Sequence, residues 1–288
     1  MSRGPVVVIV LSHRDPPLVR RLVRRIGEGT NTVAVVHHDP RGPDLGLPRS
    51  ESVLEVPDAR PADWGRMSLA HAMLKGLEFA ADKVPDLSWA LLISGQDYPC
   101  RPVQAIEADL AASASDAYLR HFRVDPRPGG DVHPWQALTR RRYLRRMRLP
   151  RMRRSVPFPR RHPFTGDLHL YVGDMWVNLG ASAVAHVLEQ RRRLVRVERY
   201  LGRCSVPDEA LLPSLLLNHA EHLDVVNDRR RYIRWHEGRA HPEFLVPADV
   251  ATASSGTDFF ARKVDSQGAA QVLDLFDESA SQQLGGRS

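Results

Sequence analysis

A short apolar run that ends abruptly in polar residues is the feature that most constrains the fold of this 288-residue chain. Residues 89–93 read Trp-Ala-Leu-Leu-Ile, and Ser-Gly-Gln-Asp-Tyr-Pro follows at once. Such a run, bounded by turn-forming residues, is typical of a buried strand in a parallel sheet. Strands of this kind deliver polar side chains to the carboxyl edge of the sheet, where α/β folds bind ligands. An ordinary turn would leave the same pattern, so residues 95–98 alone do not decide between the two interpretations.

The start of the chain shows the same organisation. Residues 6–11 and 32–36 are β-branched runs that predict buried strands, and Asp15 followed by two prolines predicts the start of a helix between them. A strand, a helix and a second strand imply parallel pairing with a right-handed crossover. Further strands are expected at 52–56, 89–93, 118–122, 168–172, 176–179 and 231–235, and further helices at 69–81, 106–112, 181–200, 207–219 and 269–276. This alternation predicts an α/β fold with a largely parallel central sheet flanked by helices.

Length and composition bound the possibilities further. We predict a single domain over residues 1–277, divided into parts 1–124 and 125–277, and a frayed tail at 278–288. No window approaches the roughly 20 apolar residues that span a bilayer, and the apolar run at 6–11 is too short for a signal peptide. We therefore expect a cytoplasmic location. The two cysteines, Cys100 and Cys204, are expected to be reduced thiols, although a pairing between them stays open.

Positive charge is concentrated in one segment. The formal net charge is +7, and residues 140–161 hold eleven arginines and no acidic residue. Such a stretch attracts anions: nucleotide phosphates, nucleic acid, acidic glycans or lipid head groups. Arginine suits bidentate contacts with phosphate or carboxylate better than lysine does. A solvated basic loop without a specific ligand explains the composition equally well.

Several short motifs carry chemistry-bearing residues. A Val-Val-His-His-Asp run at 35–39 ends the second expected strand, and adjacent histidines on a strand point to opposite faces, which argues against a metal site there. A Ser-Val-Pro-Asp-Glu run at 205–209 predicts a helix start capped by Ser205. A Phe-Ala-Arg-Lys-Val-Asp run at 260–265 offers two adjacent cations. Each motif taken singly also has a purely structural explanation. Asp39 can be a solvated carboxylate at a strand end, the acids at 208–209 can favour a helix N-terminus, and the Arg-Lys pair can lie exposed on a loop.

In their order along the chain these motifs resemble the core-2/I-branching β-1,6-N-acetylglucosaminyltransferase and peptide O-xylosyltransferase family. The resemblance also draws on Asp-Trp-Gly-Arg-Met-Ser-Leu at 63–69, Gly-Asp-Met-Trp-Val-Asn-Leu at 173–179 and Arg-Tyr-Ile-Arg-Trp at 231–235. It extends from residue 6 to about residue 265 and identifies the chain as a bacterial, soluble member. We interpret the 63–69 run as structural, with a packed indole at Trp64 and a capping serine at Ser68. The arginine-rich stretch has no counterpart in the family pattern.

The resemblance implies a GT-A-like nucleotide-sugar fold and a reaction. The family transfers a sugar from a UDP-sugar donor to an acceptor hydroxyl with inversion and without a metal, so the resemblance implies N-acetylglucosamine or xylose transfer and no cofactor. Glu209 matches the family's catalytic base, and Arg262 and Lys263 match its diphosphate-binding pair. A helix N-terminus is expected to lower the pKa of Glu209.

The remaining site candidates are assigned to nucleotide or acceptor. Asp39 and Asp97 are the nucleotide-binding candidates, and Trp176 and Trp235 are candidates to stack on the acceptor sugar, although either indole could equally lie in the core. The acceptor itself, a glycan, a peptide or a small molecule, is not named by the sequence. Two other functions use the arginine-rich stretch: nucleic-acid binding, and docking on the anionic inner face of a membrane, which is compatible with catalysis.

Overall fold

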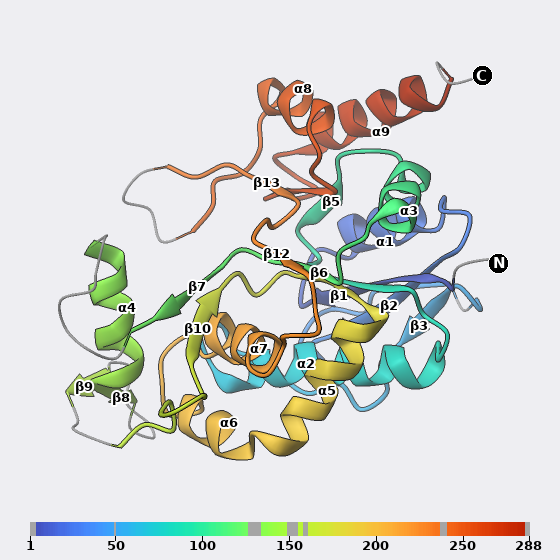
Figure 1. The fold of residues 1–288 in the computed structure, drawn as a ribbon. Coiled ribbons are helices and arrows are strands. Elements are labelled where there is room, and N and C mark those ends of the chain that lie inside the picture. The colour runs from blue at the N-terminus through green and yellow to red at the C-terminus, as the bar shows by residue number, and fades with distance from the viewer. Residues whose placement is uncertain are drawn as a thin grey trace.

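A seven-stranded sheet forms the centre of the molecule (Figure 1). The computed structural model describes residues 4–48, 50–125, 134–148, 155–157, 161–236 and 241–285. The sheet order is β12-β6-β11-β4-β1-β2-β3. Its strands are β1 (Val6–Ser12), β2 (Thr32–His38), β3 (Val53–Glu55), β4 (Trp89–Ser94), β6 (Ala117–Tyr118), β11 (Asn178–Gly180) and β12 (Val225–Val226).

The sheet is mostly parallel, as the sequence predicts. β1 pairs in parallel with β2 and β4, so Ile9 lies beside Val35 on one side and Leu92 on the other. β3 continues this parallel set beyond β2, whereas β11 runs antiparallel to both β4 and β6. The carboxyl ends of β1, β2 and β4 therefore meet at one edge of the sheet.

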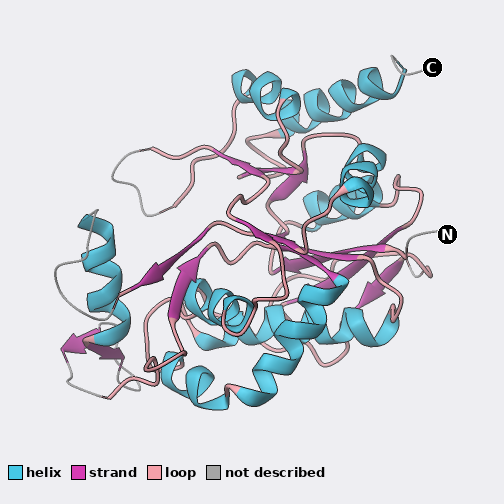
Figure 2. Cartoon of the chain, in the orientation of Figure 1, coloured by secondary structure: helices cyan, strands magenta, loops and turns pink. Residues whose placement is uncertain are grey.

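Helices cover both faces of the sheet (Figure 2). They are α1 (Pro16–Ile26), α2 (Met67–Lys83), α3 (Val103–Ala112), α4 (Pro134–Leu144), α5 (Ala181–Arg193), α6 (Val195–Leu201), α7 (Asp208–Leu217), α8 (Pro247–Ser255) and α9 (Ala270–Gly285). Side chains alternate along β1: Val7 and Ile9 join a core with α2, α5 and α7, while Val8 and Val10 join a second core with α1, α8 and α9. Burial on both faces explains the continuous apolar composition of this strand.

Three smaller sheets lie outside the central one. β13 (Arg231–Ile233), β14 (Phe260–Arg262) and β5 (Asp97–Pro99) form a three-stranded sheet in which β14 is central. Its register places Arg262 beside Asp97, which joins two motifs that are 165 residues apart in the chain. β7 (His121–Val124) pairs with β10 (Leu170–Gly173), and β8 (Arg146–Arg148) pairs with β9 (Ser155–Pro157).

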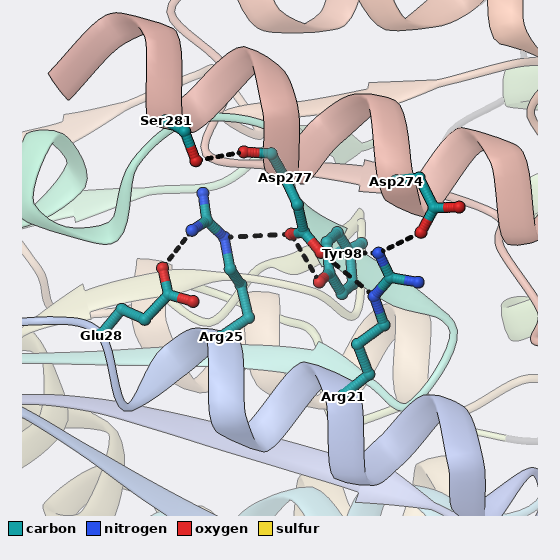
Figure 3. A network of polar contacts seen from close by, with 7 residues as sticks. All are labelled: Arg21, Arg25, Glu28, Tyr98, Asp274, Asp277 and Ser281. Carbon is teal, nitrogen blue, oxygen red and sulfur yellow. Dashed lines mark hydrogen bonds and ion pairs between the residues drawn. The ribbon is translucent and has the colours of Figure 1, made fainter. Parts of the chain in front are cut away.

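The last helix is fixed to the first by a polar network (Figure 3). Asp277 on α9 accepts hydrogen bonds from Arg21, at 2.6 Å, and from the buried hydroxyl of Tyr98, at 2.8 Å. Arg25 lies 3.5 Å from the same carboxylate, and Arg21 also reaches Asp274 at 2.7 Å. The C-terminal segment is thereby part of the domain.

Several local expectations are wrong. The helix expected over 181–200 is two helices that meet at Leu194, and the strand expected over 118–122 is divided between β6 and β7, which belong to different sheets. The tail expected to fray from 278 is helical to residue 285, because Ala280 is buried and the Asp277 network holds the helix. Residues 286–288 lie outside the described part of the chain.

Two predicted helix caps also differ. Asp15 caps α1, accepting from the Leu18 amide at 3.3 Å, as the sequence predicts. Ser68 instead lies inside α2, and its hydroxyl accepts from the Asp63 amide. Ser205 does not cap α7 either, because Pro207 occupies the cap position and makes no side-chain cap hydrogen bond.

Two further predictions concern the state of the cysteines and membrane-spanning segments. Cys100 and Cys204 are both buried and free of a disulfide. Each thiol donates to a backbone carbonyl, that of Asp258 for Cys100 and that of Tyr143 for Cys204. In the described part of the chain, no helix combines the length and apolar character that a bilayer crossing requires.

Candidate active site

A cavity of about 780 Å³ opens at the carboxyl edge of the central sheet. His13 and Arg14 follow β1, His37 and Asp39 end β2, and Gln96 follows β4, and all of them line the cavity. The opposite side comes from the second half of the chain, where Trp176, Glu209, Trp235, Arg262 and Lys263 line the same space. The structure thus brings most of the sequence-predicted site residues to a single cavity.

Arg262 is held in the cavity wall by a buried carboxylate. Its Nη1 lies 3.5 Å from Asp97 Oδ1, and its guanidinium stacks on Trp176 at 5.1 Å from the ring centroid. Arg231 approaches the same Asp97 oxygen at 3.7 Å. The Nε and Nη1 of Arg262 are buried and find no hydrogen-bond acceptor among the described residues. Because Arg262 lines the cavity, its positive charge suits an anionic ligand there.

Asp97 therefore has a different place from the one predicted for it. It is 0% exposed and is absent from the cavity lining, so it does not reach a nucleotide in this structure. Its Oδ2 accepts a hydrogen bond from the Ser94 amide, and its Oδ1 faces Arg231 and Arg262. Asp97 acts as a positioning residue for two arginines that line the cavity.

Lys263 and Arg14 add further positive charge beside Arg262. Burial lowers the pKa of Lys263, and the nearby charges of Arg14 and Arg262 lower it further. Arg14 directly follows β1, and Asp15 beside it accepts a hydrogen bond at 2.8 Å from the Ser266 amide. This contact ties the end of β1 to the Arg262–Lys263 segment. Three cations crowded in one wall favour an anion, because a bound anion relieves their mutual repulsion.

Asp39 lines the cavity but has few free acceptor positions. Its Oδ1 accepts from the Arg41 amide and from Arg41 Nε, and its Oδ2 accepts from Arg41 Nη2 and the Ala62 amide. The Arg41 guanidinium and these amides hold the pKa of Asp39 well below its usual range. The carboxylate therefore joins the loop after β2 to the segment before Trp64, and shapes the cavity wall where a nucleotide is expected.

Glu209 is placed by an unusual backbone turn. The preceding loop contains Val206 at φ 55°, a left-handed conformation that costs a β-branched residue on the order of 1–3 kcal/mol. The Val206 amide donates to the Gly65 carbonyl at 3.2 Å, and its carbonyl accepts from the Tyr143 hydroxyl at 2.6 Å. Gly65 itself adopts φ 66°, which its lack of a side chain permits. Gly65, which belongs to the 63–69 run, thus supports the loop before Glu209.

The electrostatics of Glu209 differ from the expectation. Burial raises the pKa of Glu209 to about 7, and the neighbouring Asp208 adds to the rise, while Arg142 opposes it. The helix N-terminus was expected to lower this pKa, whereas desolvation and the Asp208 charge raise it. Asp208 is buried, and burial raises its pKa to about 6. A carboxylate with a pKa near 7 is well suited to general base catalysis at neutral pH.

Indole rings form the open side of the cavity. Trp176 and Trp235 both line it, and Trp235 is 53% exposed. Trp64 was expected to pack in the interior, but it is 67% exposed and lines the cavity, with its ring 5.2 Å from that of His241. This prediction was wrong because a Trp-Gly pair on a loop has the same sequence signal whether the indole points inward or outward. Exposed indoles at a cavity mouth suit the apolar face of a sugar ring.

A comparison with protein-family models decides to which family the chain belongs. The family model described as Core-2/I-Branching enzyme matches residues 9–255 of the chain. The chain belongs to this family. This core-2/I-branching enzyme is accordingly a glycosyltransferase. A comparison with curated proteins finds no match.

A comparison with solved structures finds two that are similar to this core-2/I-branching enzyme at a low level. A glycosyltransferase involved in glycosylation of the major capsid of PBCV-1 is 11% identical, with a TM-score of 0.45, over 95% of this chain and 100% of that one. A Bacillus anthracis protein assigned as a glucose-1-phosphate thymidylyltransferase, in complex with a sucrose, is 10% identical, with a TM-score of 0.32, over 64% of this chain and 75% of that one. The family assignment rests on the family model.

Sequence reasoning missed part of the cavity lining. The lining residues it did not single out as site residues include Arg14, Arg120, Asp174, Arg229 and Arg231. Asp174 lies 3.0 Å from Arg229, and burial raises the pKa of Asp174. Arg14 had a usable signal, because it directly follows the first strand and strand ends meet at the ligand-binding edge. The other four come from loops and from the small sheet, where no strand-end rule applies.

The described part of the chain offers no evident ligand set for a metal centre. Among the described residues, no group of three or more histidine, cysteine, aspartate or glutamate side chains is placed to hold a metal ion. His37 and His38 separate as expected. His37 lines the cavity, whereas His38 donates a hydrogen bond from Nε2 to the Pro43 carbonyl and shares one between Nδ1 and the Ser12 hydroxyl.

Proposed function

We propose that this glycosyltransferase moves N-acetylglucosamine or xylose from a UDP-sugar to an acceptor hydroxyl, with inversion and without a divalent metal. The observation that carries the proposal is that Glu209 and the Arg262–Lys263 pair line one cavity. A base and a set of cations in one site are what an in-line displacement of a diphosphate requires.

The reaction follows from these roles. The acceptor oxygen attacks the anomeric carbon while Glu209 removes the hydroxyl proton, and the bond between that carbon and the diphosphate oxygen breaks. The electron pair of the broken bond stays on UDP, where Arg262 and Lys263 stabilise the developing negative charge. Attack from the face opposite the diphosphate inverts the anomeric configuration. Cations held in place before the reaction supply this stabilisation without reorganisation.

The two halves of the chain divide the substrates between them. The strand ends of β1 and β2, with Asp39 bracing the adjoining loop, support a place for the nucleotide. Trp176 and Trp235 line the same cavity as Glu209 and support a place for the acceptor sugar there. Trp235→Ala is expected to raise the acceptor KM while leaving UDP affinity unchanged.

A donor screen tests the proposal without knowledge of the acceptor. Thermal stabilisation and slow hydrolysis are measured with UDP-N-acetylglucosamine and UDP-xylose, and with ADP-glucose and GDP-mannose as controls. We expect stabilisation and hydrolysis with at least one UDP-sugar, and release of the inverted anomer in the proton NMR spectrum of the product. Absence of both effects with every UDP-sugar, in folded protein, would reject the proposal.

A further inference from the structure

The arginine-rich stretch reaches the proposed base through helix α4. Arg142 Nη1 lies 3.3 Å from Glu209 Oε2, and this contact joins the first described turns of the stretch to the cavity. The two side chains are 42% and 41% exposed, so a ligand can reach both. The ion pair is therefore a feature of the site surface, open to exchange with a substrate group.

The position of Arg142 is fixed by buried contacts of its neighbours. Tyr143 is fully buried, donates to the Val206 carbonyl at 2.6 Å, and accepts at its own carbonyl a hydrogen bond from the Tyr200 hydroxyl at 2.7 Å. Farther along, the Arg148 amide donates to the Arg203 carbonyl at 2.7 Å. The segment is thus anchored to the same loop that positions Glu209, so its positive charge stands at a defined place beside the base.

The charge around this point favours an anionic ligand. Arg120 is exposed and lines the cavity, and Arg141 and Arg145 are exposed on and after α4. No acidic residue occurs between Asp131 and Asp167 to balance the arginines of the stretch. The Arg262–Lys263 wall serves the donor diphosphate, so the charge near Glu209 belongs to the acceptor side of the proposed reaction.

An arginine in contact with a general base is unexpected, because its positive charge weakens the base. Four groups face Glu209: Asp208 on its own helix, Arg142 and Tyr143 on α4, and Asp174 between β10 and β11. Arg142 is the cation among them, and its charge lowers the pKa of Glu209, which makes the carboxylate a weaker base. It also contacts Oε2, an oxygen that the acceptor hydroxyl would approach. A negative group on the acceptor would draw Arg142 away and remove both obstacles.

We propose that the acceptor is a sugar carrying a carboxylate or phosphate close to the accepting hydroxyl, and that Arg142 binds this anion and frees Glu209 to take the hydroxyl proton. The inference rests on the proposed function, because it assumes Glu209 as the base. Arg142 contacts the substrate anion, and Arg120 adds a second positive charge in the cavity.

Matched acceptors test the inference. The kcat/KM for a UDP-sugar donor is compared between glucose and glucuronate, and between glucose and glucose 6-phosphate. The natural chain is expected to favour at least one anionic partner by tenfold or more. Arg142→Ala should bring that ratio close to one, and Arg142→Lys should restore part of it. Arg141→Ala removes the same charge one residue away, and its anionic-to-neutral ratio should match that of the natural chain.

A pH profile adds a readout that a merely structural role would not move. Loss of the cation in Arg142→Ala should shift the acidic limb of kcat/KM to higher pH, because the free carboxylate then binds its proton more tightly. Three outcomes overturn the inference. They are an acidic limb at the same pH in Arg142→Ala, an equal kcat/KM for neutral and anionic acceptors, and a preference for anionic acceptors that persists in Arg142→Ala. If the protein neither binds nor hydrolyses a UDP-sugar, the proposed function fails as well. If it hydrolyses a UDP-sugar but does not prefer anionic acceptors, only this inference is refuted.

Anionic lipid and nucleic acid are the other anionic partners that the arginines could bind, and a parallel measurement tests them. Co-sedimentation with vesicles of phosphatidylglycerol and of phosphatidylcholine, and the salt dependence of binding to single-stranded RNA, are measured for both arginine variants. Binding that Arg141→Ala and Arg142→Ala weaken equally, together with no acceptor preference, would assign the arginines to a lipid or nucleic-acid surface and overturn the inference.

Discussion

Arg262 Nη1 lies 3.5 Å from Asp97 Oδ1, and the carboxylate of this pair is completely buried beneath the cavity. Asp97 and Arg262 were predicted to bind different parts of the donor, but in the structure they contact each other and belong to the same side of the site. β5 and β14 place the residues side by side in the small sheet, and Arg231 meets the same oxygen from β13. The carboxylate fixes the cations, and the cations face the ligand.

Asp97→Asn is expected to weaken both folding and UDP binding. The change leaves Arg231 as a buried charge without its partner, and breaking such a pair costs about 3–5 kcal/mol of unfolding free energy. Urea unfolding and calorimetric UDP titration measure the two effects. Asp109→Asn breaks a more exposed pair with Arg101 and should cost under about 1 kcal/mol. Equal stability of the two variants would contradict the role assigned to Asp97.

Arg262→Ala and Lys263→Ala should each weaken UDP binding. Loss of one charge-assisted hydrogen bond to phosphate costs about 1.5–3 kcal/mol, which is roughly a tenfold to hundredfold rise in Kd. Titration with UDP and with uridine separates the diphosphate contribution, since uridine affinity should change little. Arg193→Ala removes an exposed arginine on α5 and serves as the control. Unaltered UDP affinity in both cavity variants rules the assignment out.

Glu209→Gln should reduce turnover by about 10²–10⁴-fold while leaving UDP affinity nearly unchanged. In the natural chain the acidic limb of kcat/KM should lie near pH 7, because burial raises the pKa of Glu209 to about 7. Activity is expected to fall as the pH drops below that value and the base becomes protonated. A limb below pH 5, or turnover within a few-fold of the natural chain, would contradict a role as base.

The same raised pKa makes a prediction about stability. Glu209 binds its proton more tightly in the folded chain than in the unfolded chain, where its pKa is the ordinary 4.5. Its contribution to folding is therefore most favourable at low pH and is lost as the pH rises through about 7. Glu209→Gln should be more stable than the natural chain at pH 8, and the difference should shrink toward pH 5. Melting temperatures at the two pH values measure it.

Chelation should leave the activity intact. The proposed function assigns stabilisation of the leaving diphosphate to Arg262 and Lys263 of the cavity wall, so UDP-sugar turnover should be the same with and without excess EDTA. Loss of turnover on chelation, with recovery on adding Mn²⁺ or Mg²⁺, would show that a metal is required.

Asp277→Ala should lower stability without changing turnover per folded molecule. The change removes the acceptor of the buried Tyr98 hydroxyl and an ion-pair partner of Arg25, which costs about 1–3 kcal/mol. Asp274→Ala loses only the more exposed contact with Arg21 and should cost under about 1 kcal/mol. Thermal unfolding of both variants measures the difference, and equal losses would show that the α1–α9 network of Figure 3 does not depend on Asp277.

The sequence by itself determined the central sheet and the edge at which the cavity opens. Apolar runs such as residues 6–11 and 89–93 are buried on both faces, and burial of that kind leaves a continuous pattern that no loop imitates. The residues that end these strands follow from the same rule, which is why Arg14 and Asp39 lie at the cavity. The order of the motifs identified the family, and the family model confirms it.

Only the tertiary structure decided what each site residue contacts. Asp97 is buried under Arg262, and Trp64 faces the cavity, because pairing across the small sheet and loop packing depend on residues far apart in the chain. The pKa of Glu209 rises because the surrounding protein desolvates its carboxylate and Asp208 lies beside it, whereas local sequence shows only the helix dipole that opposes this rise. Desolvation and long-range charge pairing are properties of the assembled fold.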